Sequence, residues 1–186
     1  MHQNFVEITD KRLLDVFTIE KMKKTELLLN NKKITVDSLH EFGLSQFCFT
    51  SPNKHTDPND FMLGLGSMKT KKFKTRDFVW FIDHYKDTVY HDIYETVPKI
   101  FENPIKIGRM RVMLLYPKYC LTWHKDSCIR LHIPLETNPG CLIVIESEAR
   151  HLSEGIPCLC NTTKMHTAVN ASQHNRYHLV MDIIEQ

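Results

Sequence analysis

The stretch WHKDSCIRLHIPLETN, residues 123–138, contains two pairs of polar side chains with a two-residue spacing, His124 with Asp126 and Arg130 with His132, just before and within a segment that is typical of a β-strand. On extended backbone, side chains two residues apart lie on the same face. His124 and Asp126 are therefore expected to point in one direction, and Arg130 and His132 to share a face of the next strand. Composition alone would put no charged side chains on such apolar strands, so this polar row indicates a binding site.

Further short strands are predicted on both sides of this stretch. The residues between them include typical turn formers such as Asn138-Pro139-Gly140. The predicted strands are Arg109–Tyr116, Cys120–His124, Ile129–Leu135, Cys141–Ile145, Pro157–Asn161, Thr167–Asn170 and Arg176–Ile184. Because no helical pattern interrupts them, they predict an antiparallel sandwich or barrel.

Residues 1–105 have a different pattern and are predicted to be helical and loop-like. Thr9-Asp10 can cap a helix through Leu13 and Met22. The strongest helical periodicity runs from Thr75 to Phe101, before Asn103-Pro104. The length of 186 residues fits one domain, with residues 1–105 forming its helical N-terminal part and 106–186 its β-rich core.

Composition excludes several classes of protein. The apolar fraction is 42% and the net charge is only +2, so intrinsic disorder is not expected. The longest apolar runs, such as Cys141–Ile145, are too short to cross a membrane, and the charges in the first 20 residues do not fit a secretory signal peptide. We therefore expect a cytoplasmic protein with reduced cysteines, no membrane association and no nucleic-acid partner.

His124, Asp126 and the later His166 predict a metal site. Two imidazoles and one carboxylate on one side of an ion form a facial triad, which leaves positions open for other ligands and suits non-haem Fe(II). A structural zinc ion would instead need a fourth protein ligand. The competing interpretation is that each histidine is an ordinary hydrogen-bonded side chain in a chain that has 11 of them.

Arg176 adds a second feature, because it begins an apolar strand ten residues after His166. An arginine that faces the interior of a barrel must meet an anion, since an unpaired buried charge is costly. Its planar guanidinium suits a carboxylate, which it can bind through two hydrogen bonds.

The runs 123–138, HTAVN (166–170) and RYHLVMD (176–182) together resemble the aspartyl/asparaginyl β-hydroxylase-like branch of the Fe(II)/2-oxoglutarate dioxygenases. This cupin-type branch includes small cis-proline hydroxylases and many viral and bacterial members. The resemblance covers about residues 107–184. It implies an α+β, mainly β fold, with a double-stranded β-helix (jelly-roll) core and N-terminal helices packed on it.

The resemblance also implies roles for individual residues. His124, Asp126 and His166 match the iron ligands, and Arg176 matches the arginine that pairs with the distal carboxylate of 2-oxoglutarate. His132 matches a histidine near the cosubstrate, and Arg130 an arginine that helps to hold the substrate. The animal aspartyl hydroxylases lack the carboxylate ligand, so Asp126 is a departure that argues against direct transfer of their substrate choice.

The implied activity is hydroxylation of an amino-acid side chain, free or in a peptide, with release of succinate and carbon dioxide. The implied cofactors are Fe(II), 2-oxoglutarate as cosubstrate and dioxygen, with ascorbate in a supporting role. The alternative is a non-catalytic, cupin-like module that binds a metal or ligand. The identity of the substrate and the oligomeric state stay open.

Overall fold

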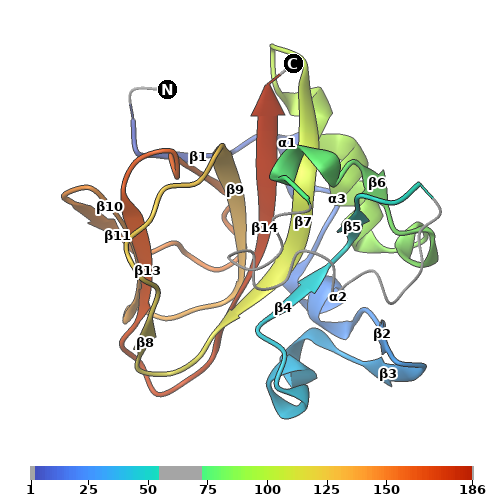
Figure 1. Cartoon of the computed structure of the whole chain (residues 1–186), viewed down its shortest axis with the longest axis horizontal. Helices are drawn as coiled ribbons and strands as arrows, with labels where there is room; N and C mark the ends of the chain where they lie inside the picture. The colour runs from blue at the N-terminus through green and yellow to red at the C-terminus, as the bar shows by residue number, and fades with distance from the viewer. Residues whose placement is uncertain (1–2, 55–72, 186) are drawn as a thin grey trace.

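Eight strands between residues 105 and 185 are divided between two antiparallel sheets in the computed structural model, which describes residues 3–54 and 73–185 (Figure 1). The strands are β7 (Ile105–Leu115), β8 (Tyr119–Cys120), β9 (Ile129–Glu136), β10 (Cys141–Ile145), β11 (Glu148–Arg150), β12 (Cys158–Cys160), β13 (His166–Asn170) and β14 (Arg176–Glu185). One sheet contains the order β12-β9-β14-β7 and the other the order β11-β10-β13-β8. These two strand orders are the topology of a double-stranded β-helix, which confirms the predicted fold class.

The N-terminal part contributes strands as well as helices, so the prediction that it is only helical and loop-like is wrong. The described residues before 105 include β1 (Phe5–Glu7), β2 (Leu27–Leu29), β3 (Lys32–Ile34), β4 (Gln46–Cys48), β5 (Thr50–Ser51) and β6 (Trp80–Phe81). Strands β1 and β4 extend the larger sheet to the order β1-β12-β9-β14-β7-β4. These strands are only two or three residues long, which is too short to show a clear alternating pattern.

The helices are shorter than the sequence predicts. They are α1 (Lys11–Leu14), α2 (Ile19–Lys24) and α3 (Val89–Thr96), with the 3₁₀ helices η1 (Val36–Phe42), η3 (Thr75–Asp77), η4 (Asp83–Tyr85) and η5 (Val97–Ile100). The first predicted helix is divided because the side chain of Thr18 caps a new helix by accepting a hydrogen bond from the Lys21 amide. The predicted continuous helix over residues 75–101 is wrong, because β6 pairs with β5 and the Ile82 amide donates to the Phe49 carbonyl.

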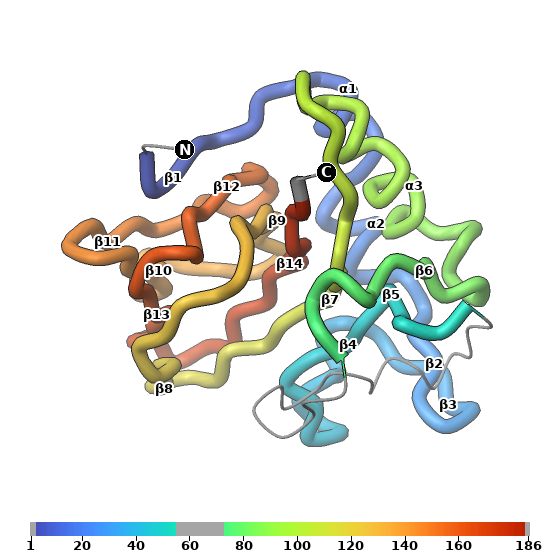
Figure 2. The backbone as a smooth tube through the Cα atoms, turned by 45° about the horizontal axis from the view of Figure 1, so that its top comes forward, coloured from blue at the N-terminus to red at the C-terminus, as the bar shows by residue number. Residues whose placement is uncertain are grey.

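The outer face of the larger sheet is covered by the N-terminal part. Strand alternation turns Val112, Ile133 and Leu179 to this face, where they join one buried cluster with residues of the helices, such as Leu13 and Tyr90. In Figure 2 the three α-helices and β2–β6 lie on one side of β7 and β14, and the smaller sheet lies on the other. Helix and sheet therefore bury a shared apolar core.

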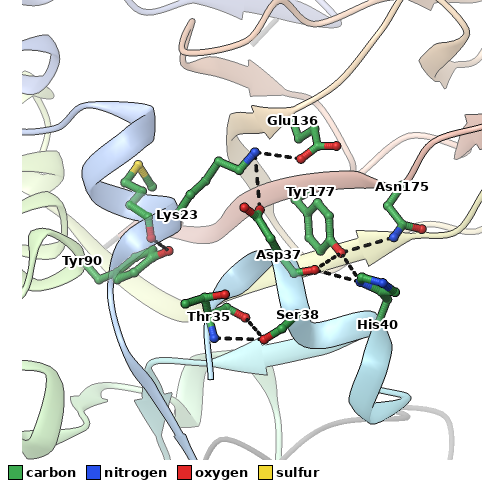
Figure 3. Close-up of polar contacts among 10 residues, drawn as sticks. Lys23, Thr35, Asp37, Ser38, His40, Tyr90, Glu136, Asn175 and Tyr177 are labelled. Carbon is green, nitrogen blue, oxygen red and sulfur yellow. Dashed lines mark hydrogen bonds and ion pairs between the residues drawn. The ribbon is translucent and has the colours of Figure 1, made fainter. Parts of the chain in front are cut away.

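Polar contacts also join the two parts (Figure 3). The ammonium group of Lys23 on α2 lies 2.8 Å from Glu136 Oε2 on β9 and 3.4 Å from Asp37 Oδ1 on η1. The hydroxyl of Tyr177 on β14 donates to the Asp37 carbonyl at 3.1 Å. These contacts position the N-terminal part against the sheet that carries Arg176.

The inner face of the same sheet is polar. Residues paired across neighbouring strands point to the same side. Asp182 pairs with Arg130, and Val180 pairs with both His132 and Arg111. The side chains that line the interior of the barrel are therefore the ones that break the apolar pattern of the strands.

Candidate metal and cosubstrate site

His124 and His166 lie opposite each other where the chain leaves β8 and enters β13. Their backbones form an antiparallel bridge, with the His124 amide 3.1 Å from the His166 carbonyl and the His166 amide 2.9 Å from the His124 carbonyl. Their ring centroids are 4.2 Å apart. Two hydrogen bonds of the backbone thus bring together imidazoles that are 42 positions apart in the sequence.

Both imidazoles are oriented by backbone carbonyls. The Nδ1 atom of His124 lies 2.7 Å from the Thr122 carbonyl oxygen, and that of His166 lies 2.9 Å from the Lys164 carbonyl oxygen. A carbonyl can only accept, so each neutral ring donates its Nδ1 proton and leaves the lone pair of Nε2 free for a metal ion. The backbone therefore selects the tautomer that a ligand histidine needs.

Asp126 completes a group of three possible ligands. Its carboxylate lies 3.9 Å from His124 Nε2 and 3.2 Å from His166 Nε2. One ligand atom from each of the three residues can be chosen so that all lie within 4.8 Å of one another. The Asp126 amide donates to the Thr162 carbonyl at 2.8 Å, which fixes the backbone after the histidine.

Arg130 links the Asp126 carboxylate to a second, fully buried carboxylate. Arg130 Nη1 lies 2.6 Å from Asp126 Oδ2, and Arg130 Nε lies 2.7 Å from Asp182 Oδ1. Burial would raise the pKa of Asp126, but the neighbouring side chains of His166 and Arg130 outweigh this effect and hold that pKa below its usual value. Asp126 is therefore poised as a carboxylate, the form that binds a metal ion.

A cavity of about 370 Å³ runs inside the barrel next to this triad. It is lined by both imidazoles, by Arg130, His132 and Arg176, and by apolar side chains including Ile143 and Val180. His166 and Asn170 are the first and last residues of β13, roughly 13 Å apart on extended backbone, and Arg176 follows the turn after Asn170. One cavity therefore has the triad at one end of the barrel and a guanidinium at the other.

Arg176 is buried without a carboxylate partner among the described residues. Only 5% of it is exposed, and its Nε and Nη2 atoms contact the ring nitrogens of His178 at 3.0 Å and 2.8 Å. Burial lowers the pKa of Arg176 to about 10. His132 Nε2 is also buried and has no hydrogen-bond partner in the part of the chain that the structure describes. An anionic ligand in the cavity would supply the charged partner that Arg176 lacks and the hydrogen-bond partner that His132 Nε2 lacks among the described residues.

The structure thus brings together all six residues that the sequence singles out. His124, Asp126 and His166 form one cluster, while His132 and Arg176 line the same cavity. Arg130 also lines the cavity, but its guanidinium holds Asp126 and Asp182. Its predicted contact with substrate therefore stays a prediction.

Two polar residues of this site, His178 and Asp182, are not singled out by the sequence analysis. Both lie on β14 and are at most 2% exposed. His178 follows Arg176 by two positions, so strand alternation could have placed it on the inner face. Asp182 lies next to an irregularity in the pairing between Met181 and Ile183, where simple alternation is a poor guide.

The two buried histidines next to Arg176 predict a loss of stability in mild acid. Burial and the charge of Arg176 hold the pKa values of His132 and His178 well below 6.5. Below about pH 6.5 the unfolded chain gains protons that the folded chain does not, so the free energy of unfolding falls by up to about 1.4 kcal/mol per pH unit for each histidine. Above that pH, neither histidine contributes a slope.

Urea unfolding at pH 7.5, 6.0 and 5.0 measures this effect. A His178→Gln variant should show a smaller loss between pH 6.0 and 5.0 than the native chain, while the exposed His174→Gln should match the native chain. Equal pH dependence in all three proteins would contradict the assignment.

Comparison with known families identifies one match. The profile of the Aspartyl/Asparaginyl beta-hydroxylase family matches residues 85–186, which include the whole barrel and every site residue named above. No curated protein sequence matches the chain. In the part of the chain that the structure describes, no helix is long and apolar enough to cross a membrane.

Several solved structures are similar in fold over about half of the chain. A cupin domain from Bordetella pertussis Tohama I has 18% identity and a TM-score of 0.37, with 46% of this chain and 86% of that chain covered. An oxidoreductase of the 2OG-Fe(II) oxygenase family from Burkholderia pseudomallei has 11% identity and a TM-score of 0.42, with 55% and 54% covered. A viral collagen prolyl hydroxylase from Paramecium bursaria Chlorella virus-1 has 10% identity and a TM-score of 0.45, with 53% and 73% covered. Similarity at this level does not bear on the activity of the chain.

Proposed function

Because the chain belongs to the aspartyl/asparaginyl β-hydroxylase family and is an oxygenase, we propose that it hydroxylates an amino-acid side chain, free or in a peptide, using Fe(II) and 2-oxoglutarate. One observation carries the proposal: a single cavity is lined by the two ligand imidazoles and by a buried arginine that has no carboxylate partner among the described residues. The two imidazoles fit a metal ion, and the arginine fits one carboxylate of a dicarboxylate bound in the same cavity.

The residues of the triad fit Fe(II) by their chemistry. Two neutral imidazoles and one carboxylate from one side leave other positions open, which non-haem iron requires. His124, Asp126 and His166 would hold the ion. When bound, the ion and 2-oxoglutarate supply the oxidising chemistry, in which dioxygen is consumed and succinate, carbon dioxide and a hydroxylated product are released.

The inner part of the cavity fits 2-oxoglutarate. Arg176 can bind the distal carboxylate through two charge-assisted hydrogen bonds, and His178 orients the guanidinium that does so. His132, with its free Nε2 atom, can hydrogen-bond the cosubstrate in the same cavity. Ile143 and Val180 make part of the wall of the same cavity apolar.

The test is formation of succinate from 2-oxoglutarate with added Fe(II) and ascorbate, across candidate amino acids and peptides. We expect slow succinate formation without substrate and a clear stimulation by the true substrate. If 2-oxoglutarate does not bind in the presence of a metal ion, the proposal fails, and a ligand-binding role without turnover becomes the better explanation.

Asp182→Asn should weaken metal binding without removing a ligand. Asp182 is fully buried and accepts from Arg130, which in turn holds Asp126. Loss of such a supporting contact typically costs 10–100-fold in metal affinity, so we expect the dissociation constant for Fe(II) or Mn(II) to rise by about that factor. Isothermal titration with Mn(II) measures it.

Glu146→Gln serves as the control for Asp182→Asn. Glu146 is an exposed carboxylate that pairs with Lys164 away from the cavity lining, so its variant should bind metal like the native protein. An unchanged affinity for Mn(II) in a folded Asp182→Asn protein would show that Arg130 and Asp182 do not position Asp126.

A further inference from the structure

A second cavity, of about 540 Å³, lies on the other side of the Asp126–Arg130 pair. Arg130 lines both cavities, so this ion pair lies between the interior space and the second one. The second cavity is formed by the start of β7, the end of β14, the residues after His124 and the segment around η3. It therefore lies at the end of the barrel that carries the triad, opposite Arg176.

This outer cavity is strongly basic. Its lining includes Lys74, Arg76, Arg109, Lys125 and Arg130, with Asp126 as its single carboxylate among the described residues. Asp126 is already paired with Arg130 and is the proposed metal ligand. Four cations therefore face this space without a carboxylate partner in the lining.

Arg109 distinguishes this cluster from an ordinary solvated surface. Only 5% of Arg109 is exposed, its Nε atom has no hydrogen-bond partner, and it makes no ion pair with a described residue. Its guanidinium lies over the ring of Phe78, 4.5 Å from the ring centroid. A buried arginine that keeps donors unpaired is costly unless a ligand supplies an acceptor.

Close packing holds the other cations beside Arg109. A Cβ atom on Gly108 would lie 2.9 Å from the Thr75 carbonyl oxygen, so only glycine lets η3 approach β7 this closely. Asp77 accepts from the Lys74 amide at 2.6 Å and fixes the turn between these residues. Lys74 and Arg76, which flank Thr75, are thereby placed at the edge of the cavity that Arg109 lines.

From these contacts we propose that Arg109, Arg76 and Lys74 form an anion subsite that holds a multiply charged oxyanion of the substrate, a phosphate group or a pair of carboxylates. This inference rests on the proposed function and narrows its substrate class. A substrate anchored there would lie next to the Asp126–Arg130 pair, with its reacting carbon toward the triad. An uncharged or zwitterionic amino acid would leave these cations unpaired.

The subsite can be tested without metal or turnover. Isothermal titration of the metal-free full chain with inorganic phosphate and with tricarballylate, at low ionic strength, measures anion binding directly. We expect Arg109→Met and Arg76→Gln each to weaken binding by about tenfold or more, as loss of a charge-assisted hydrogen bond implies. Lys106→Gln, an exposed cation on the same strand outside the cavity lining, should bind like the native chain.

Arg176→Met removes the cosubstrate anchor, which can itself bind an anion, so the titrations are repeated in this background. Binding that remains there, and that Arg109→Met or Arg76→Gln weakens, belongs to the subsite. Tighter binding of phosphate would indicate a phosphorylated substrate, and tighter binding of tricarballylate would indicate a polycarboxylate. If neither probe binds, or if Arg109→Met and Arg76→Gln bind as tightly as the native chain, the subsite is wrong. Arg76 is exposed, so its variant decides the question even if Arg109→Met does not fold.

Binding of 2-oxoglutarate in the presence of Mn(II) is measured in parallel. If that binding persists while both anion probes fail, only the anion subsite is lost and the proposed function stands. If 2-oxoglutarate does not bind, the proposed function itself fails.

Discussion

Alanine in place of His124, Asp126 or His166 should abolish iron-dependent formation of succinate. Residues that only support metal ligands typically contribute 10–100-fold to metal affinity or activity, so removal of a ligand should cost at least about 100-fold. Among the residues that the structure describes, these three form the group of histidine, cysteine or acidic side chains whose ligand atoms lie close enough together to hold an ion. Turnover with saturating Fe(II) and 2-oxoglutarate measures the loss.

The fold should survive these substitutions. The three residues do not belong to the large apolar cluster that joins the sheet to the helices, so the far-UV circular dichroism and the urea midpoint should stay close to native. His174→Ala is the matched control, because His174 is an exposed histidine in the turn before β14. Near-native turnover by a folded His124→Ala or His166→Ala protein would show that the reaction does not use this triad.

The sequence predicts the centre of the site well because strand geometry is local. A two-residue spacing on extended backbone places His124 and Asp126 on one side, whatever the rest of the chain does. The same alternation places His132 two positions after Arg130 on the inner face, and the structure has both in the cavity lining. The distance in sequence from Asp126 to His166, by contrast, carries no information about their contact. That contact depends on the pairing of β13 with the residues after β8.

The N-terminal part is predicted less well because its structure depends on distant partners. Residues 75–101 have a helical period, but pairing of β6 with β5 and the hydrogen bond from Ile82 to Phe49 replace helical bonds with bonds across the fold. Likewise, no local pattern shows that Arg130 reaches Asp182, which lies 52 positions later. Tertiary contacts decide both features, and intrinsic propensity is a weak guide where such contacts compete.

Arg176→Met should affect cosubstrate binding and the stability of the free protein in opposite directions. Truncating one partner of a buried charge pair typically costs about 2–5 kcal/mol, so the dissociation constant for 2-oxoglutarate should rise by roughly 30-fold to several thousand-fold. Without the cosubstrate, the same guanidinium is buried with no carboxylate partner among the described residues. Replacing it with an apolar side chain of similar length should raise the free energy of unfolding of the free protein by about 1–4 kcal/mol.

Two measurements on the same variant distinguish an anchor from a structural residue. Thermal unfolding with and without 2-oxoglutarate, in the presence of Mn(II), should show a higher midpoint for the free variant than for the free native protein, and little further rise on addition of the cosubstrate. A residue needed only for folding would instead lower the midpoint of the free protein. If Arg176→Met is folded and 2-oxoglutarate stabilises it as much as it stabilises the native chain, the distal carboxylate does not bind at Arg176, and the inner end of the 370 Å³ cavity serves another ligand.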